Sequence, residues 1–134
     1  MPSIDAIGGI GHAHATKLRK ARVRTTEALL KKGATRTDRR HLATATGFTD
    51  QQILGWVNRA DLIRVKGVGA EYCDLLEAAG VDTVKELKTR KANALHARMV
   101  EINNQKQLVR RLPTEAMVAS WIAAAAQLPA VVKY

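Results

Sequence analysis

The amino-acid sequence predicts an all-α fold, and three observations support that prediction. The 134-residue chain is rich in Ala, Leu, Lys, Arg, Glu and Gln, which favour helices. No segment alternates apolar and polar residues over the length of a strand, and Gly and Pro fall mostly between the apolar-periodic segments. Hydrophobic residues make up 46% of the chain, enough for a real core, so we expect a single domain over residues 1–134.

One sequence pattern occurs twice along the chain. In each copy an apolar residue precedes a Gly-apolar-Gly turn and a helical pattern follows, so that Gly9 and Gly11 correspond to Gly67 and Gly69 at an offset of 58 residues. Leu18, Ala21, Val23, Thr25 and Leu29 match Leu76, Ala79, Val81, Thr83 and Leu87 at the same offset. We therefore expect two pseudo-symmetric repeats, residues 4–60 and 61–128, that share one core and precede a C-terminal tail at 129–134.

Each repeat is expected to hold four helices in the same order. In the first repeat they are predicted at 12–21, 26–32, 37–46 and 50–60. In the second repeat they are predicted at 70–79, 84–88, 93–103 and 115–127, with a helical extension over 105–111. The last helices align at an offset of 65 rather than 58, so the second repeat contains a seven-residue insertion.

Threonines and tryptophans define the last helix of each repeat. Thr49 and Thr114 are predicted N-caps, and Gln52 completes a capping box with Thr49. Trp56 and Trp121 fall on the apolar stripe of their helices, so we interpret both as core anchors and not as platforms for base stacking.

The first helix of each repeat ends on a different residue. Gly80 is an expected left-handed cap, but the matching residue is Arg22. A non-glycine residue in that conformation costs on the order of 1 kcal/mol. Either the first helix ends differently, or a basic side chain has a purpose at that corner, and the sequence leaves both open.

The two turns resemble the helix-hairpin-helix motif. Gly9, Gly11, Ala15 and Leu18 match it in the first copy, and Gly67, Gly69 and Leu76 match it in the second, with Cys73 in the Ala place. From Ile7 to Trp121 the chain also resembles an uncharacterised bacterial domain-of-unknown-function family built on two such motifs. The resemblance is carried by the sequence segments 56–62 and 67–87. The resemblance implies an all-helical fold and DNA binding through backbone N–H groups on phosphates, largely without base readout.

The charge of the chain also favours a polyanionic partner, and it is concentrated near the first turn. The net charge is +10; the first 60 residues hold 11 Lys and Arg against 4 Asp and Glu, and the remainder holds 11 against 8. Because helix starts favour anions, we predict a DNA phosphate site at the first hairpin, made of Gly9, Ile10, Gly11, His12, Ala13, His14, Lys17 and Lys20.

The second hairpin is expected to bind phosphate more weakly, because Glu71, Asp74 and Glu77 follow it. Its predicted site consists of Arg64, Lys66, Gly67, Val68 and Gly69. Arg36, Arg39 and Arg40 share one helix face and are an auxiliary basic set, which either extends the backbone contact or is simply a solvated face.

No catalytic, metal or cofactor signature is present in the sequence. His12 and His14 point in different directions on a helix, carboxylates are not grouped, and no phosphate-binding Gly-Lys loop occurs. We expect no enzymatic activity, no cofactor, no metal, no small-molecule substrate and no membrane span. The single Cys73 and the absence of a leader-like N-terminus suggest a cytoplasmic location.

The leading hypothesis is therefore sequence-nonspecific DNA binding. The alternative is a protein-interaction or oligomerisation module with a structural helix-hairpin-helix fold, and RNA binding ranks third because aromatic residues are only 4% of the chain. The first hairpin lacks a leading helix, so we expect 115–127 to supply it, from the same chain or from the partner in a homodimer. The alanine-rich outer face of 115–127 is expected to lie under the tail or another subunit.

Overall fold

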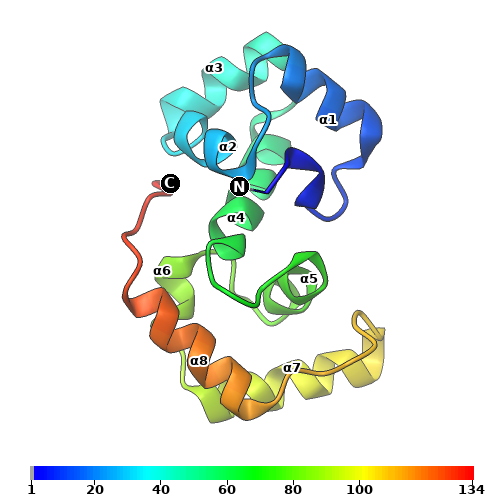
Figure 1. The fold of residues 1–134 in the computed structure, drawn as a ribbon, viewed down its shortest axis with the longest axis vertical. Coiled ribbons are helices and arrows are strands. Elements are labelled where there is room, and N and C mark those ends of the chain that lie inside the picture. Colours follow the sequence, from blue (N-terminus) through cyan, green and yellow to red (C-terminus); the bar gives the residue numbers. More distant parts are fainter. Residues whose placement is uncertain (1) are drawn as a thin grey trace. The chain divides into compact units, whose positions relative to one another are not determined.

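The computed structural model describes residues 2–134, and within them the chain is entirely helical, with no β-strand. A 3-10 helix, η1 (Ile4–Ala6), precedes eight α-helices (Figure 1). They are α1 (Gly11–Lys20), α2 (Thr26–Lys32), α3 (Arg36–Thr46), α4 (Asp50–Ile63), α5 (Ala70–Ala78), α6 (Val84–Leu87), α7 (Ala92–Lys106) and α8 (Glu115–Ala126). The predicted all-α class is confirmed.

The helices form two compact units. Unit 1 contains the chain up to Asp61 together with Ala130–Tyr134, and unit 2 contains Leu62–Pro129. The division falls within α4. The core cluster of unit 2 is built from residues of that unit, from Leu62 to Ala125.

The N-terminal segment contributes buried side chains to the core of unit 1. Ile4, Ile7, Leu18, Leu29 and Ile53 are almost completely buried. The backbone of this segment pairs with the turn after α1, because the Ile4 N–H donates to the Arg24 carbonyl at 3.0 Å and the Thr26 N–H donates to the Pro2 carbonyl at 3.1 Å. The N-terminal segment and η1 thus lead directly into the first hairpin.

The last helix, α8, is part of the core of unit 2. It packs against α6 and α7, and Val118, Trp121 and Ala125 are its buried residues. The expectation that 115–127 acts as the leading helix of the first hairpin is therefore corrected: η1 precedes that hairpin within unit 1, and α8 buries its apolar stripe within unit 2.

Threonine caps define the start of most helices, as the sequence predicted for Thr49 and Thr114. The Thr114 hydroxyl accepts from the Met117 N–H at 3.1 Å. Thr49 and Gln52 form the predicted capping box, with backbone N–H to side-chain oxygen distances of 3.1 and 3.0 Å. The side chains of Thr25, Thr35 and Thr83 cap α2, α3 and α6 in the same way.

The helical extension predicted over 105–111 is wrong. α7 ends at Lys106, and Gln107 follows in the left-handed region with φ 49°. Asn103 holds the chain beyond that point, because its side-chain oxygen accepts from the Val109 N–H at 3.0 Å and its amide donates to the Val109 carbonyl at 3.2 Å. An Asn side chain that satisfies the backbone in this way replaces helical hydrogen bonds.

The C-terminal tail packs within unit 1. The Lys133 N–H donates to the Ala34 carbonyl at 2.7 Å, and the Asn58 amide donates to the Tyr134 hydroxyl at 3.2 Å. The sequence expected the tail over the alanine-rich face of 115–127; the structure places Ala130–Tyr134 in unit 1.

Candidate nucleic-acid interface

The first hairpin is a tight turn over Ile7–Gly11 with an open outer surface. The Ile10 N–H donates to the Ile7 carbonyl at 3.3 Å, and both isoleucine side chains are buried. Gly9 and Gly11 have φ values of 79° and 74°, a conformation that side chains disfavour. A Cβ added at either glycine would meet no atom within 4 Å, so a ligand can approach this backbone closely.

The start of α1 carries free hydrogen-bond donors. Its N-cap, Ile10, supplies no side-chain hydrogen bond, as is also the case at the starts of α5 and α7, whereas threonine side chains cap α2, α3, α4, α6 and α8. The N–H groups of Gly11, His12 and Ala13 are therefore without a capping side chain, and all three residues are exposed. They lie at the positive end of the helix dipole, where an anion is favoured.

Cationic side chains extend this helix start along α1. Lys17 and Lys20 are exposed and share a helix face with Ala13. The Lys17 ammonium lies 5.5 Å from the centroid of the Phe48 ring, and this cation–π contact helps to orient the lysine side chain. Arg19 forms an ion pair with Asp5, so its charge is partly neutralised.

His14 is half-buried in unit 1, and its assignment to the phosphate site stays a prediction. Its Nδ1 donates to the Ile10 carbonyl at 2.9 Å, and its ring lies 5.1 Å from that of Phe48 and 5.3 Å from that of Trp56. The His14 side chain therefore connects the hairpin backbone at Ile10 to the rings of Phe48 and Trp56. The spacing of His14 four residues before the buried Leu18 is the sequence signal that could have indicated this position.

The second hairpin shares the positive φ at its first glycine but differs at its second, because Gly69 has φ −105° and Gly11 has φ 74°. The Val68 N–H donates to the Val65 carbonyl at 3.1 Å, and Gly67 has φ 93°. A Cβ at Gly67 would lie 3.1 Å from Trp121 Nε1, so this side of the turn is packed against the indole. Trp121 and Trp56 are 3% and 8% exposed, which confirms that both are core residues.

The charges around the second hairpin offer little to a phosphate. Arg64 donates to the Pro129 carbonyl at 2.9 Å, whereas Lys66 is exposed. Glu71 is exposed in the first turn of α5, at the position that Ala13 occupies in α1. Its carboxylate already occupies the favourable end of the helix dipole, so a phosphate there would meet repulsion.

Arg39 does not belong to the auxiliary basic set, which is a correction. Its side chain is 5% exposed and donates to the carbonyls of Gly33, Ala34 and Lys133 at 2.9, 3.1 and 2.8 Å. Burial lowers the pKa of the Arg39 guanidinium, and Tyr134 opposes that effect. Arg36 and Arg40 are exposed. Arg39 therefore holds the tail and the carbonyls after α2, and only Arg36 and Arg40 face solvent.

The structure excludes one of the two alternatives given for Arg22, namely that the first helix ends differently from its counterpart. Arg22 has φ 68° and Gly80 has φ 90°, and the same hydrogen bond follows each: Val23 N–H to Leu18 carbonyl and Val81 N–H to Leu76 carbonyl, both at 2.9 Å. Both helices end in the same way, so Arg22 adopts a conformation that glycine would accept without strain. Its side chain is exposed.

The described part of the chain, residues 2–134, contains neither a cluster of metal ligands nor a membrane-spanning helix. No group of three or more His, Cys, Asp or Glu residues comes close enough there to hold a metal ion. Each helix over residues 2–134 is also too short or too polar to cross a lipid bilayer.

The fold and its surface define a basic, all-helical protein with an exposed helix start as its candidate site. The model of the family described as "Domain of unknown function (DUF4332)" matches residues 8–128, a span that includes the Gly-apolar-Gly glycines of both hairpins, and the chain belongs to this family. No curated protein and no solved structure matches the chain.

Proposed function

We propose that this protein is a non-enzymatic DNA-binding module that grips phosphates without reading base sequence. The observation that carries the proposal is the start of α1, where an open glycine turn leads to donors that no side chain caps. His12, Lys17 and Lys20 supply exposed basic groups beside them. Backbone donors and flexible cations recognise phosphate but carry no base information.

We further propose that the two hairpins are helix-hairpin-helix motifs with unequal roles. The matching turn hydrogen bonds and positive φ values of Gly9 and Gly67 support a common motif. The second hairpin is a structural copy, because Glu71 and Trp121 occupy the places that are open in the first.

The substitution Ala13→Glu tests the proposed site with little risk to folding. It places at the start of α1 the residue that α5 already has, and an acid there favours the helix. We expect DNA affinity to fall about tenfold at 100 mM salt, because a phosphate contact is lost and a repulsion is added. The measurement is a fluorescence anisotropy titration of labelled duplex DNA.

Gln51→Glu is the matched control. It makes the same charge change at an exposed position in the first turn of another helix, α4, in the same unit. We expect it to change affinity less than threefold. The wild-type protein should show a log–log salt slope of roughly −3 to −4 for four phosphate contacts. A flat salt dependence, or equal effects of the two variants, would contradict the proposed site.

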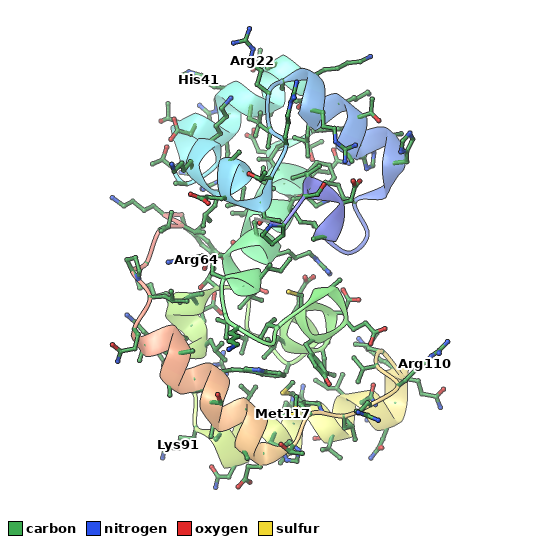
Figure 2. The ribbon with its side chains drawn as sticks, viewed as in Figure 1. Arg22, His41, Arg64, Lys91, Arg110 and Met117 are labelled. Carbon is green, nitrogen blue, oxygen red and sulfur yellow. The ribbon has the colours of Figure 1, made fainter. Side chains whose placement is uncertain are left out.

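A second candidate function, self-association through α8, is favoured by one observation. The outer face of α8 is exposed and uncharged, and Met117, which Figure 2 labels, lies one turn before the buried Trp121 and is 36% exposed. If this face is an interface, the mass in solution should stay above that of one chain at 1 M salt and fall to it in Ala123→Glu. A single-chain mass in the wild type at every salt concentration excludes this candidate.

A further inference from the structure

A basic hollow lies in unit 1 at the end of α1 opposite the hairpin. We name it the α1–α3 hollow: it has a volume of about 420 Å³ and is open to solvent. Its lining includes Ala21 at the end of α1, Lys31 and Lys32 at the end of α2, and Asp38, His41 and Leu42 of α3. The predicted DNA site contained none of these residues.

The polar lining of the α1–α3 hollow is mainly basic. Lys31, Lys32 and His41 are exposed, and Asp38 is the acidic residue among the lining side chains. Lys31 has only a loose ion pair with Glu27, at 3.9 Å. The two lysines also offset the negative end of the α2 dipole. The hollow therefore presents positive charge over an apolar floor.

Arg22 adds a strained cation at the edge of this hollow. It follows Ala21, which lines the hollow, and Figure 2 shows Arg22 and His41 at the same end of unit 1. The residue is exposed and keeps φ 68°, where glycine would be less strained. Strain that a simple substitution would remove is a reason to look for a function of the side chain.

The same place in unit 2 is also basic, and this is an independent observation. The α5–α7 hollow, of about 110 Å³, is lined by Ala79, Arg90, Lys91 and Arg98 together with apolar Ala94 and Leu95. Ala79 and Arg90 match Ala21 and Lys32 at the offset of 58 residues. Unit 2 has an acidic hairpin, yet its hollow contains no carboxylate in its lining. In unit 2, Arg90 donates to the Gly80 carbonyl at 2.9 Å and Arg98 pairs with Glu101 at 3.6 Å. The recurrence of cations at this place in both units still favours an anionic ligand.

We infer that the α1–α3 hollow is a second phosphate contact on the DNA that the first hairpin binds. The inference rests on the proposed function. The ten residues of α1 separate the two places by about 15 Å, on the order of four base pairs of rise. An open hollow lined by flexible, exposed cations suits a backbone phosphate better than a small ligand, which needs enclosing polar groups.

The double variant Lys31→Gln and Lys32→Gln tests the hollow, and Lys85→Gln with Lys88→Gln is its matched control. The control removes two exposed lysines that line neither hollow. Duplex DNA affinity is measured from 50 to 200 mM salt. We expect the hollow variant to reduce the magnitude of the log–log slope by about 1 to 2, and the control by less than about 0.5. Arg22→Gly should weaken binding about three- to tenfold at 100 mM salt while raising the melting temperature.

Failure of the inference is distinguishable from failure of the proposed function. If the wild type does not bind duplex DNA at low salt, the proposed function fails, and the inference with it. If the wild type binds and Ala13→Glu weakens binding, but the hollow variant behaves as its control, only the inference is overturned. A hollow variant that loses affinity for inorganic phosphate without a change in the DNA slope also overturns it, because the hollow then binds a small anion.

Discussion

Units 1 and 2 contain related turns in different surroundings: Gly9 and Gly67 both have positive φ, whereas Gly11 has positive φ and Gly69 does not. In unit 1 the turn is open above Gly9, and the exposed Ala13 follows it. In unit 2 the turn at Gly67 is packed on Trp121, and the exposed Glu71 follows it. The comparison teaches that the shared pattern gives Gly9 and Gly67 the same positive φ, whereas the neighbouring side chains determine whether a phosphate can approach the turn.

Each unit also uses a polar side chain to hold a segment outside the helices, a buried one in unit 1 and a half-buried one in unit 2. Unit 1 uses the buried Arg39 to bind the carbonyls of Gly33, Ala34 and Lys133, and so fixes the C-terminal tail. Unit 2 uses Asn103 to hold the segment after α7 through both backbone groups of Val109. In each unit a polar side chain replaces missing regular structure, so its loss should weaken that unit without touching the hairpin.

The largest expected effect comes from Arg39→Met. Three carbonyls lose a charged donor, and we expect the free energy of unfolding to fall by about 3–5 kcal/mol. Urea denaturation measures this loss. Arg36→Met, on the exposed side of α3, should change stability by less than about 0.5 kcal/mol. If Arg39→Met stays stable and weakens DNA binding more than Arg36→Met does, Arg39 is a phosphate contact after all.

A smaller effect should separate the two turns. Gly67→Ala meets both an unfavourable φ of 93° and the Trp121 indole at 3.1 Å, so we expect a loss of about 2–3 kcal/mol. Gly9→Ala has only the unfavourable φ of 79° and should lose about 1–2 kcal/mol. Thermal unfolding of both variants checks the order. Equal losses of stability would show that the Trp121 side chain moves away from the added Cβ at little cost, and that it does not block the second turn.

The smallest expected effect is reciprocal and concerns the ends of α1 and α5. Arg22→Gly should stabilise the protein by about 0.5–1 kcal/mol, because glycine relieves the strain at φ 68°. Gly80→Arg should destabilise it by a similar amount, about 0.5–1 kcal/mol, since its Cβ has room, with its nearest neighbour, Arg90, at 3.9 Å. Calorimetric melting temperatures provide the measurement. A loss of stability in Arg22→Gly would mean that the arginine side chain stabilises this corner by itself.

Local and periodic signals in the sequence predicted much of the fold. Thr49, Gln52 and Thr114 were identifiable because a capping side chain and its N–H partner lie within three residues. Trp56 and Trp121 were identifiable because helical spacing places them on an apolar stripe. The candidate hairpin site was recognised for the same reason, since its turn and its helix start are contiguous.

Side chains whose partners are distant in sequence, or whose surroundings depend on packing, were not predicted correctly. Arg39 was placed on a basic surface because its partner at Lys133 is 94 residues away. The sequence does not reveal that His14 packs against Phe48 and Trp56, because that packing requires α4 to lie beside α1. The hollow that Lys31 and His41 share was missed because α2 and α3 line it together.

The order of residues alone specifies the helical class, the threonine caps, the place of the two glycine turns and the unequal charge around them. These depend on backbone sterics and on hydrogen bonds between near neighbours, which the order of residues specifies. Only the tertiary structure decided that Arg39 is buried, that Arg22 keeps a left-handed conformation, and that α8 packs within unit 2. Those outcomes depend on which segments, distant in sequence, pack together and bury each other's surface. A sequence pattern within one segment does not contain that information.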